Sequence, residues 1–124
     1  MKILLDTLII IWFLEDNNRL KRQYIDLIVN PLNIIYFSPV SLAEMAIKAS
    51  KNKLKYPDEI INICIDQGLE ELGLTSKHCV LLKELPYFHH DPFDRLLLVQ
   101  AKSENMHLMT EDHIFHQYDV NVIK

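Results

Sequence analysis

Short apolar runs alternate with longer amphipathic segments along this chain, and this alternation limits the folds open to it. Strands are expected at 2–5, 34–37, within 69–74, at 107–109 and at 120–123. Helices are expected at 7–14, 20–30, 39–51, 57–67, 75–85, 92–104 and 111–118. Strands that alternate with helices predict an α/β fold, a three-layer α/β/α sandwich with a central, mostly parallel sheet.

The first expected strand is apolar throughout, as a strand buried on both faces of a parallel sheet should be. It contains Ile3, Leu4 and Leu5, and Asp6 follows at once. Ligands of open parallel sheets bind beyond the carboxyl ends of the strands. We therefore look for a functional site at that edge.

Four acidic residues stand near the same predicted edge. Asp6 follows the first strand, and Asp112 lies within three residues of the strand at 107–109. Asp94 is near the start of the sixth expected helix, and Glu44 is about two turns into the third. Carboxylate oxygens are the ligands that Mg²⁺ and Mn²⁺ prefer. Together the four acids predict a divalent metal site.

Three of these acids also have ordinary structural explanations. Asp6 could cap the first helix, and Asp112 could be a first-turn acid that complements a helix dipole. Asp91 fits a helix cap, with Pro92 and Asp94 in the first turn. For any single acid, the structural explanation is as plausible as a metal-binding role. Four acids on one edge of the sheet together favour a metal site.

Glu44 could close a capping box that begins at Ser41. Ser38 followed by Pro39 is a better helix start, because serine caps well and proline favours the first helical position. Glu44 would then lie inside the helix among small and apolar residues, where a charged side chain is rare unless it is paired or functional.

The composition excludes some functions and weighs against others. Only two glycines occur, which excludes glycine-rich phosphate loops. The net charge of -4 counts against nucleic-acid binding, unless bound cations reverse the local charge at the acids. Lys48, Lys51, Lys53 and Lys55 form a basic stretch that is either a phosphate contact or a solvated surface.

Other site types have weaker support. The apolar run at 8–14 is too short to cross a bilayer, and no signal peptide precedes it, so we expect a cytoplasmic protein without membrane contact. Cys64 and Cys79 are expected as small buried hydrophobes rather than a disulfide. No Cys or His set has zinc spacing, and Ser38 and Ser41 have no nearby histidine base.

Several segments together resemble one known family. They are Leu4-Leu5-Asp6-Thr7 followed by Trp12, the stretch 38–48, the stretch 90–97, and Met109-Thr110-Glu111-Asp112 with Phe115. Nearly end to end, these segments resemble PIN-domain proteins of the VapC toxin type. The resemblance implies one PIN-like domain over residues 1–124.

The resemblance also implies roles for individual residues. The family's metal-binding acids are matched by Asp6, Glu44, Asp94 and Asp112. Asp94 rather than Asp91 takes the third place, because Leu97 and Ala101 follow it at the family's helical spacing.

Further positions match the surroundings of the family's metal. Thr7 and Thr110 match small hydroxyl residues near it, and Arg95 matches the arginine that follows the third acid. Lys48 and Arg95 are candidates for phosphate contacts. Leu8 stands where relatives often have histidine or serine, which puts a polar contact in doubt but removes no metal ligand.

The implied activity is that of a Mg²⁺- or Mn²⁺-dependent endoribonuclease, the toxin of a toxin–antitoxin pair. Asp6, Asp94 and Asp112 would hold one or two ions, and Glu44 would hold a metal or orient the attacking water. Water as the nucleophile would leave 5′-phosphate and 3′-hydroxyl ends on the RNA. The expected partners are a VapB-like antitoxin and a second copy of this chain in a homodimer.

Two alternatives stay open at this point. One is a catalytically inactive PIN-like interaction domain. The other is a different phosphoryl-handling α/β domain, such as a phosphatase or receiver. An aspartate phosphatase would want a second acid two residues after Asp6, where Leu8 stands. We also expect His90 to orient the loop before Asp91, and Tyr87 and Phe88 to pack against the core rather than stack on a base.

Overall fold

The computed structural model describes residues 1–123 and is built around one five-stranded sheet. The strands run in the order β3-β2-β1-β4-β5, and every pairing among the described residues is parallel. They are β1 (Lys2–Leu5), β2 (Ile34–Phe37), β3 (Glu70–Glu71), β4 (His107–Met109) and β5 (Asn121–Val122). The predicted α/β class and the positions of all five strands are confirmed.

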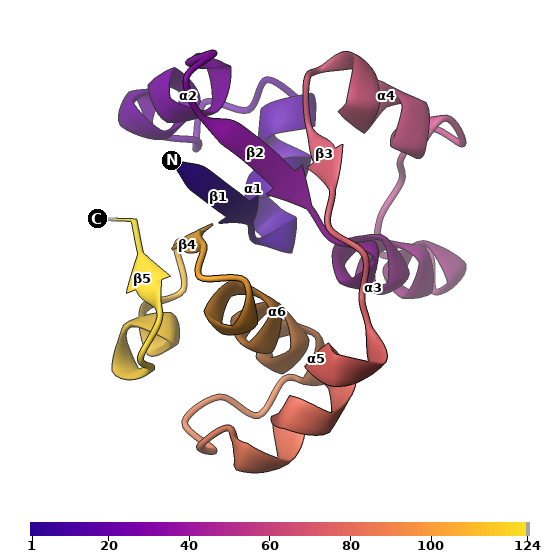
Figure 1. The fold of residues 1–124 in the computed structure, drawn as a ribbon. Coiled ribbons are helices and arrows are strands. Elements are labelled where there is room, and N and C mark those ends of the chain that lie inside the picture. Colours follow the sequence, from indigo (N-terminus) through magenta and orange to yellow (C-terminus); the bar gives the residue numbers. More distant parts are fainter. Residues whose placement is uncertain (124) are drawn as a thin grey trace.

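Helices cover both faces of this sheet. They are α1 (Thr7–Leu14), α2 (Arg22–Val29), α3 (Pro39–Ser50), α4 (Ile60–Asp66), α5 (Ser76–Leu81) and α6 (Pro92–Ser103), with 3₁₀ turns η1 (Leu82–Glu84) and η2 (His113–Gln117). Figure 1 shows α1, α2 and α4 on one side of the sheet, α5 and α6 on the other, and α3 at one edge. This is the expected three-layer arrangement.

Two hydrophobic clusters fill the space between these layers. The side chains of β1 alternate between them, because successive residues of a strand point to opposite faces. Ile3 and Leu5 join the cluster under α1, α2 and α4, whereas Leu4 joins the cluster under α6. All three are fully buried. The strand therefore has a core on each face, which explains why its sequence lacks polar residues until Asp6.

Some local expectations were wrong. Pro57 does not open α4, which begins at Ile60 with Glu59 in the capping position. The segment 111–118 contains a 3₁₀ turn rather than an α-helix, and Asp112 caps it by accepting a hydrogen bond from the Ile114 N–H. Cys64 is buried as expected, but Cys79 is exposed, and both are free thiols.

Helix α1 is apolar on every side, which led to the expectation of a homodimer. Much of that surface is covered by this chain: Ile9 and Ile10 are buried, and residues 11–14 are partly buried against the core. Leu8 is the exception, with 44% of its surface exposed. The homodimer and the single domain over 1–124 stay predictions. Within the described residues, no helix has the length and apolar character to cross a membrane.

Ser38 ties the start of α3 to α6 and to the loop after β3. Its hydroxyl oxygen caps α3 by accepting from the Val40 N–H at 3.0 Å, and it donates to Gln100 Oε1 at 2.6 Å. The Gln100 amide in turn donates to the Leu72 and Gly73 carbonyls. Ser38 and Gln100 are both fully buried, so a lost partner would not be replaced by bulk water.

We expect Ser38→Ala to lower the free energy of unfolding by about 1–2 kcal/mol, because the helix loses its cap and a buried amide oxygen loses its donor. Urea unfolding of both proteins measures this. Ser76→Ala is the matched control, since Ser76 is exposed and Thr75 caps its helix. Equal losses in the two variants would contradict the role given to Ser38.

Candidate metal site

The site begins where β1 and β4 end side by side. The Asp6 N–H donates to the Met109 carbonyl at 3.0 Å, which extends the pairing of the two strands by one residue. The chain leaves β1 toward β2 on one side and returns to β4 on the other. Such a reversal of strand order opens a crevice at the carboxyl edge of a parallel sheet. Asp6 and Thr110 therefore meet at the bottom of a crevice.

Both carboxylate oxygens of Asp6 accept hydrogen bonds. Its Oδ1 accepts from the Thr7 N–H and its Oδ2 from the Thr110 hydroxyl, each at 2.7 Å. Only 8% of the residue is exposed. Burial raises the pKa of Asp6, and the hydrogen bond from Thr110 offsets part of that rise. Asp6 thus caps α1, as its ordinary structural explanation required, and also faces the crevice.

The Asp94 carboxylate can face the crevice because Asp91 caps α6. Asp91 Oδ1 accepts from the N–H groups of Phe93 and Asp94, and Pro92 occupies the first turn. The Asp94 carboxylate is therefore not needed for capping. Burial, followed by repulsion from Asp6 and Asp91, raises its pKa to about 7. A carboxyl group with so high a pKa is a marker of functional sites.

Glu44 lies inside α3, since Ser38 caps that helix as predicted. Its Oε2 forms an ion pair with Lys48 Nζ at 3.1 Å, one helical turn away. Its Oε1 is buried and has no hydrogen-bond partner among the described residues. Buried polar atoms are nearly always partnered, so this oxygen points to an interaction that the protein alone does not supply.

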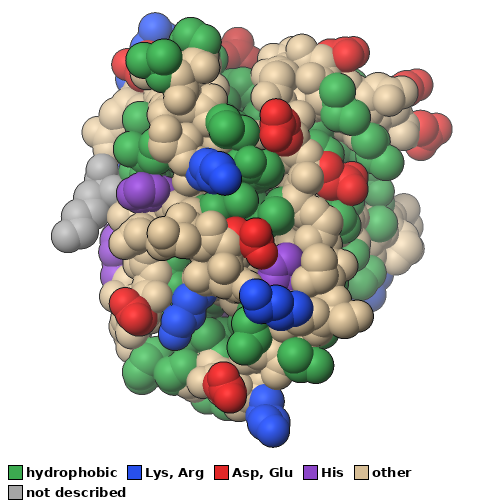
Figure 2. All heavy atoms as spheres, viewed as in Figure 1, with side chains coloured by type: hydrophobic (Ala, Val, Ile, Leu, Met, Phe, Trp, Pro, Cys, Tyr) green, Lys and Arg blue, Asp and Glu red, His purple; other side chains and the backbone are tan. Residues whose placement is uncertain are grey.

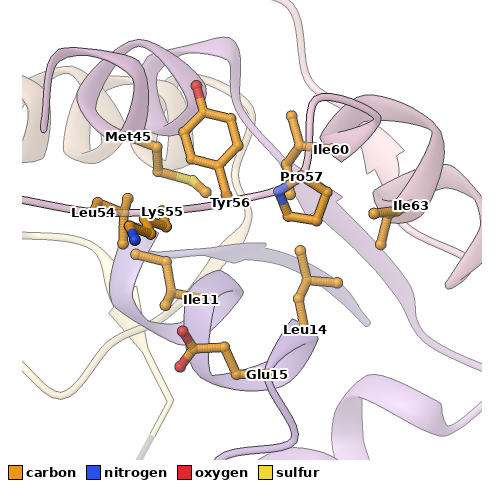
Figure 3. Close-up of a pocket in the computed structure, with 10 residues that line it drawn as sticks. All are labelled: Ile11, Leu14, Glu15, Met45, Leu54, Lys55, Tyr56, Pro57, Ile60 and Ile63. Atoms are coloured by element: carbon orange, nitrogen blue, oxygen red, sulfur yellow. The ribbon is translucent and has the colours of Figure 1, made fainter. Parts of the chain in front are cut away.

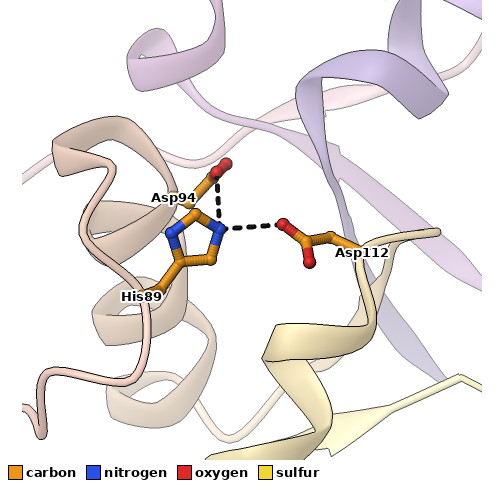
Figure 4. A group of neighbouring side chains, drawn as sticks. All are labelled: His89, Asp94 and Asp112. Atoms are coloured by element: carbon orange, nitrogen blue, oxygen red, sulfur yellow. Dashed lines mark hydrogen bonds and ion pairs between the residues drawn. The ribbon is translucent and has the colours of Figure 1, made fainter.

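Asp112 and Asp94 both approach the same histidine nitrogen (Figure 4). His89 Nε2 lies 2.8 Å from Asp112 Oδ2 and 3.0 Å from Asp94 Oδ2. One ligand atom from each of the three side chains lies within 4.8 Å of the others, so the group could hold a metal ion. The expectation for His90 was wrong, because His89 makes the contacts before Asp91 while exposed His90 stacks on Tyr87.

All four predicted acids border one cleft of about 290 Å³. Its walls are Asp6, Thr7, Leu8, Ile11, Glu44, Lys48, Asp94, Glu111 and Asp112. Residues far apart in the sequence are thus brought together as expected. Glu111 was missed as a member of this wall, although its position between Thr110 and Asp112 was a usable signal.

Arg95 does not face this cleft, and its expected contact with phosphate needs correction. The residue is 5% exposed, and its guanidinium donates to the carbonyls of Leu82, Leu85, Pro86 and His89. The Tyr87 ring lies over it at 3.8 Å. Arg95 therefore stabilises the loop that carries His89, and its guanidinium donors are used by the carbonyl groups of that segment.

The two predicted hydroxyl residues, Thr7 and Thr110, lie next to the acids. Thr110 donates to Asp6, and its oxygen accepts from the Asp112 N–H at 3.0 Å, so one hydroxyl links two of the acids. Thr7 lines the cleft and donates to the Ser41 hydroxyl at 2.9 Å. Ser41 is fully buried and joins α1 to α3, a role that the sequence did not indicate.

Comparison with known proteins identifies the family. The PIN domain family matches residues 3–121. The chain is a PIN-domain protein. Members of this family are generally nucleases and use divalent metal ions. No curated protein matches this PIN domain.

Solved structures agree on the fold. A chain from VapBC2 of Rickettsia felis, bound to a DNA fragment from the promoter, gives a TM-score of 0.75 at 20% identity, covering 99% of this chain and 98% of that one. DNA-bound VapBC of Salmonella typhimurium gives 0.70 at 15%, covering 99% and 97%. VapBC-1 of nontypeable Haemophilus influenzae gives 0.67 at 22%, covering 100% and 98%. At these identities the likeness shows the fold.

The donor set of this PIN domain fits a hard divalent cation. Five carboxylates and no thiolate border the cleft, and oxygen ligands are what Mg²⁺ and Mn²⁺ prefer. Glu44 Oε1 is an acceptor without a donor, and the high pKa of Asp94 indicates a carboxylate whose negative charge is poorly compensated. A cation would relieve both.

The pKa of Asp94 predicts a pH-dependent effect of Asp94→Asn on stability. Because the folded pKa, about 7, exceeds the ordinary 3.8, the native protein binds this proton more tightly than the unfolded chain. The stabilisation is complete below about pH 4 and is lost as the pH rises through 7. We therefore expect the metal-free variant to exceed the wild type in stability by roughly 1–3 kcal/mol near pH 8, and by much less near pH 5.

Urea unfolding with EDTA at several pH values measures this difference. Asp58→Asn, the same change at an exposed residue, is the control and should show no such trend. A stability difference for Asp94→Asn that stays constant from pH 5 to pH 8 would mean that the carboxyl is not strained.

Proposed function

We propose that this PIN domain is a Mg²⁺- or Mn²⁺-dependent endoribonuclease. The observation that carries the proposal is the convergence of Asp6, Glu44, Asp94 and Asp112 on one cleft, with a buried Glu44 oxygen left unpartnered. Carboxylates that serve only as helix caps have no reason to share a cleft. The substrate is RNA, and the reaction is hydrolysis of a phosphodiester bond.

Each acid has a role that matches its surroundings. Asp6, Asp94 and Asp112 would hold the cation, which when bound supplies charge stabilisation to phosphate and lowers the pKa of water. Glu44 would complete the metal site or orient the attacking water through Oε1. Thr110 would fix the direction of the Asp6 carboxylate through its 2.7 Å hydrogen bond. Water as the nucleophile gives 5′-phosphate and 3′-hydroxyl products.

RNA binding has to overcome a net charge of -4. On the face drawn in Figure 2, acidic and basic side chains are interspersed, and no continuous basic tract is visible. Lys48 borders the cleft with its side chain 49% exposed, so it is our candidate for a phosphate contact. Its partner Glu44 would release it when a cation binds that carboxylate.

We expect Asp94→Asn to reduce the rate of RNA cleavage in Mg²⁺ or Mn²⁺ by about 100-fold or more, because one metal-binding charge is lost at nearly constant shape. EDTA should abolish wild-type cleavage, and added Mg²⁺ should restore it. The assay uses a mixed-sequence RNA with analysis of the product ends. Asp58→Asn should cleave like the wild type.

The alternative of an inactive interaction domain makes the opposite prediction. If purified wild-type protein with millimolar Mg²⁺ or Mn²⁺ leaves a range of RNAs intact while it still binds metal, the nuclease proposal is wrong. Cleavage that persists in EDTA or in Asp94→Asn would show a contaminating ribonuclease rather than this site.

Metal binding should also stabilise the folded protein. At a free Mg²⁺ concentration ten times the dissociation constant, the stabilisation is RT ln 11, about 1.4 kcal/mol. For a domain of this size the melting temperature should rise by roughly 4–8 °C. Asp94→Asn should reduce the rise, and Asp58→Asn should keep it. A wild-type melting temperature indifferent to millimolar Mg²⁺ and Mn²⁺ would contradict the metal site.

We further propose that the chain is a toxin held inactive by a VapB-like antitoxin. The shared fold with chains of VapBC structures supports this. An apolar pocket beside α1 offers a binding surface (Figure 3), with Leu14, Met45 and Ile60 in its walls. Ile11 borders both this pocket and the acidic cleft. One peptide segment could therefore lie in the pocket and end at the acids.

An antitoxin tail with an arginine should inhibit cleavage by filling the cleft, since arginine pairs bidentately with carboxylates. We expect saturating antitoxin to stop hydrolysis, and an antitoxin whose arginine is replaced by alanine to bind with weaker inhibition. Cleavage and binding are measured on the same samples. An unchanged hydrolysis rate at saturation would exclude this mode of inhibition.

A further inference from the structure

Hydrogen bonds to the backbone of His89 and packing of its ring hold this residue in position. Its N–H donates to the Tyr118 hydroxyl at 2.7 Å, and its carbonyl accepts from Arg95 at 3.2 Å. Its ring packs against Phe115 with 5.4 Å between ring centroids. The residue is only 8% exposed. The backbone of His89 is therefore fixed, and its ring cannot turn away from the acids without losing its packing against Phe115.

The backbone determines which ring nitrogen carries the proton. The Asp91 N–H donates to His89 Nδ1 at 3.2 Å, so Nδ1 must present a lone pair. The proton of the neutral ring then lies on Nε2. Nε2 is the atom between the two carboxylates, 2.8 Å from Asp112 and 3.0 Å from Asp94. The N–H therefore donates to Asp112, while Asp94 Oδ2 lies within ion-pair distance of the same nitrogen.

We propose that His89 is a positioning residue of the metal site, a neutral donor that fixes the Asp112 carboxylate beside Asp94 and is not itself a metal ligand. This inference rests on the proposed metal site. It assigns the Nε2–H to Asp112 Oδ2, with Asp94 Oδ2 3.0 Å from the same nitrogen. The Asp94 carboxylate is left for the cation.

Two physical arguments favour a donor over a ligand. To bind a metal through Nε2, the neutral ring would have to carry its proton on Nδ1, where it would face the Asp91 N–H. Two donors would then point at each other, and that hydrogen bond would be lost. In addition, Asp94 and Asp112 repel one another, and the N–H that donates to Asp112 stabilises that carboxylate before any cation arrives. A ring that left to bind metal would remove this compensation.

Spectroscopy of the ring distinguishes the two roles directly. In the metal-free protein labelled with ¹⁵N-histidine, we expect the His89 ring to be the Nε2–H tautomer. Saturating Mg²⁺, which is diamagnetic, should move the Nε2 and Hε2 resonances but leave the proton on Nε2. Loss of the Nε2 proton with a change to the Nδ1–H tautomer on adding Mg²⁺ would overturn the proposal. A metal-free ring that already carries its proton on Nδ1 would overturn it as well.

Variants test whether the donor to Asp112 matters. His89→Leu removes the donor, and we expect Mg²⁺ and Mn²⁺ to bind 10–100-fold more weakly, by the same factor for both. His89→Gln retains an N–H donor and should recover part of the affinity. His90→Leu is the matched control, since exposed His90 stacks on Tyr87, and it should bind metal like the wild type. Affinities come from calorimetry for Mg²⁺ and from the EPR signal of free Mn²⁺.

The outcomes separate this inference from the proposed function. Unchanged affinity in His89→Leu, confirmed folded by its HSQC spectrum, would overturn the positioning role while leaving the nuclease intact. If His89→Leu does not fold, the tautomer measured in the wild type still decides between donor and ligand. A wild-type protein that binds neither ion would overturn the metal site itself, and the His89 inference with it.

Discussion

The hydrogen bond from the Asp6 N–H to the Met109 carbonyl is the contact on which the site depends. It forms only because β1 and β4 are parallel neighbours whose ends coincide, and that pairing in turn requires a strand without polar side chains on either face. Once the ends coincide, Thr110 reaches both Asp6 and the backbone of Asp112. Two acids more than a hundred positions apart in the sequence are thus fixed by one strand pairing and one hydroxyl.

The other side of the cleft depends on how two helices begin. Ser38 caps α3 and Asp91 caps α6, so that Glu44 and Asp94 do not satisfy N–H groups of their own helices. Residues that cap are short polar side chains next to a proline in both cases. The capping explanation offered for the acids is therefore partly right, since capping by Asp91 is what makes Asp94 available.

Much of this was predictable because it is local. A strand end places Asp6, and a proline at a helix start places Asp94, whatever the rest of the chain does. The choice between His89 and His90, by contrast, depends on a loop whose path is set by Arg95 through four carbonyl groups. Nothing in the sequence near two adjacent histidines says which one faces the acids. For the same reason Arg95 was mistaken for a phosphate contact: its charge is satisfied by distant backbone.

The acids of the cleft differ in how far the protein compensates the negative charge of each carboxylate. Asp6 receives a hydrogen bond on each oxygen, whereas Glu44 Oε1 receives none and Asp94 is strained enough to have a pKa of about 7. A cation gains most where the protein has compensated charge least. It follows that Asp94 offers a cation an incompletely compensated carboxylate and Glu44 offers an oxygen without a donor, whereas the direction of the Asp6 carboxylate is already fixed at the base of the cleft.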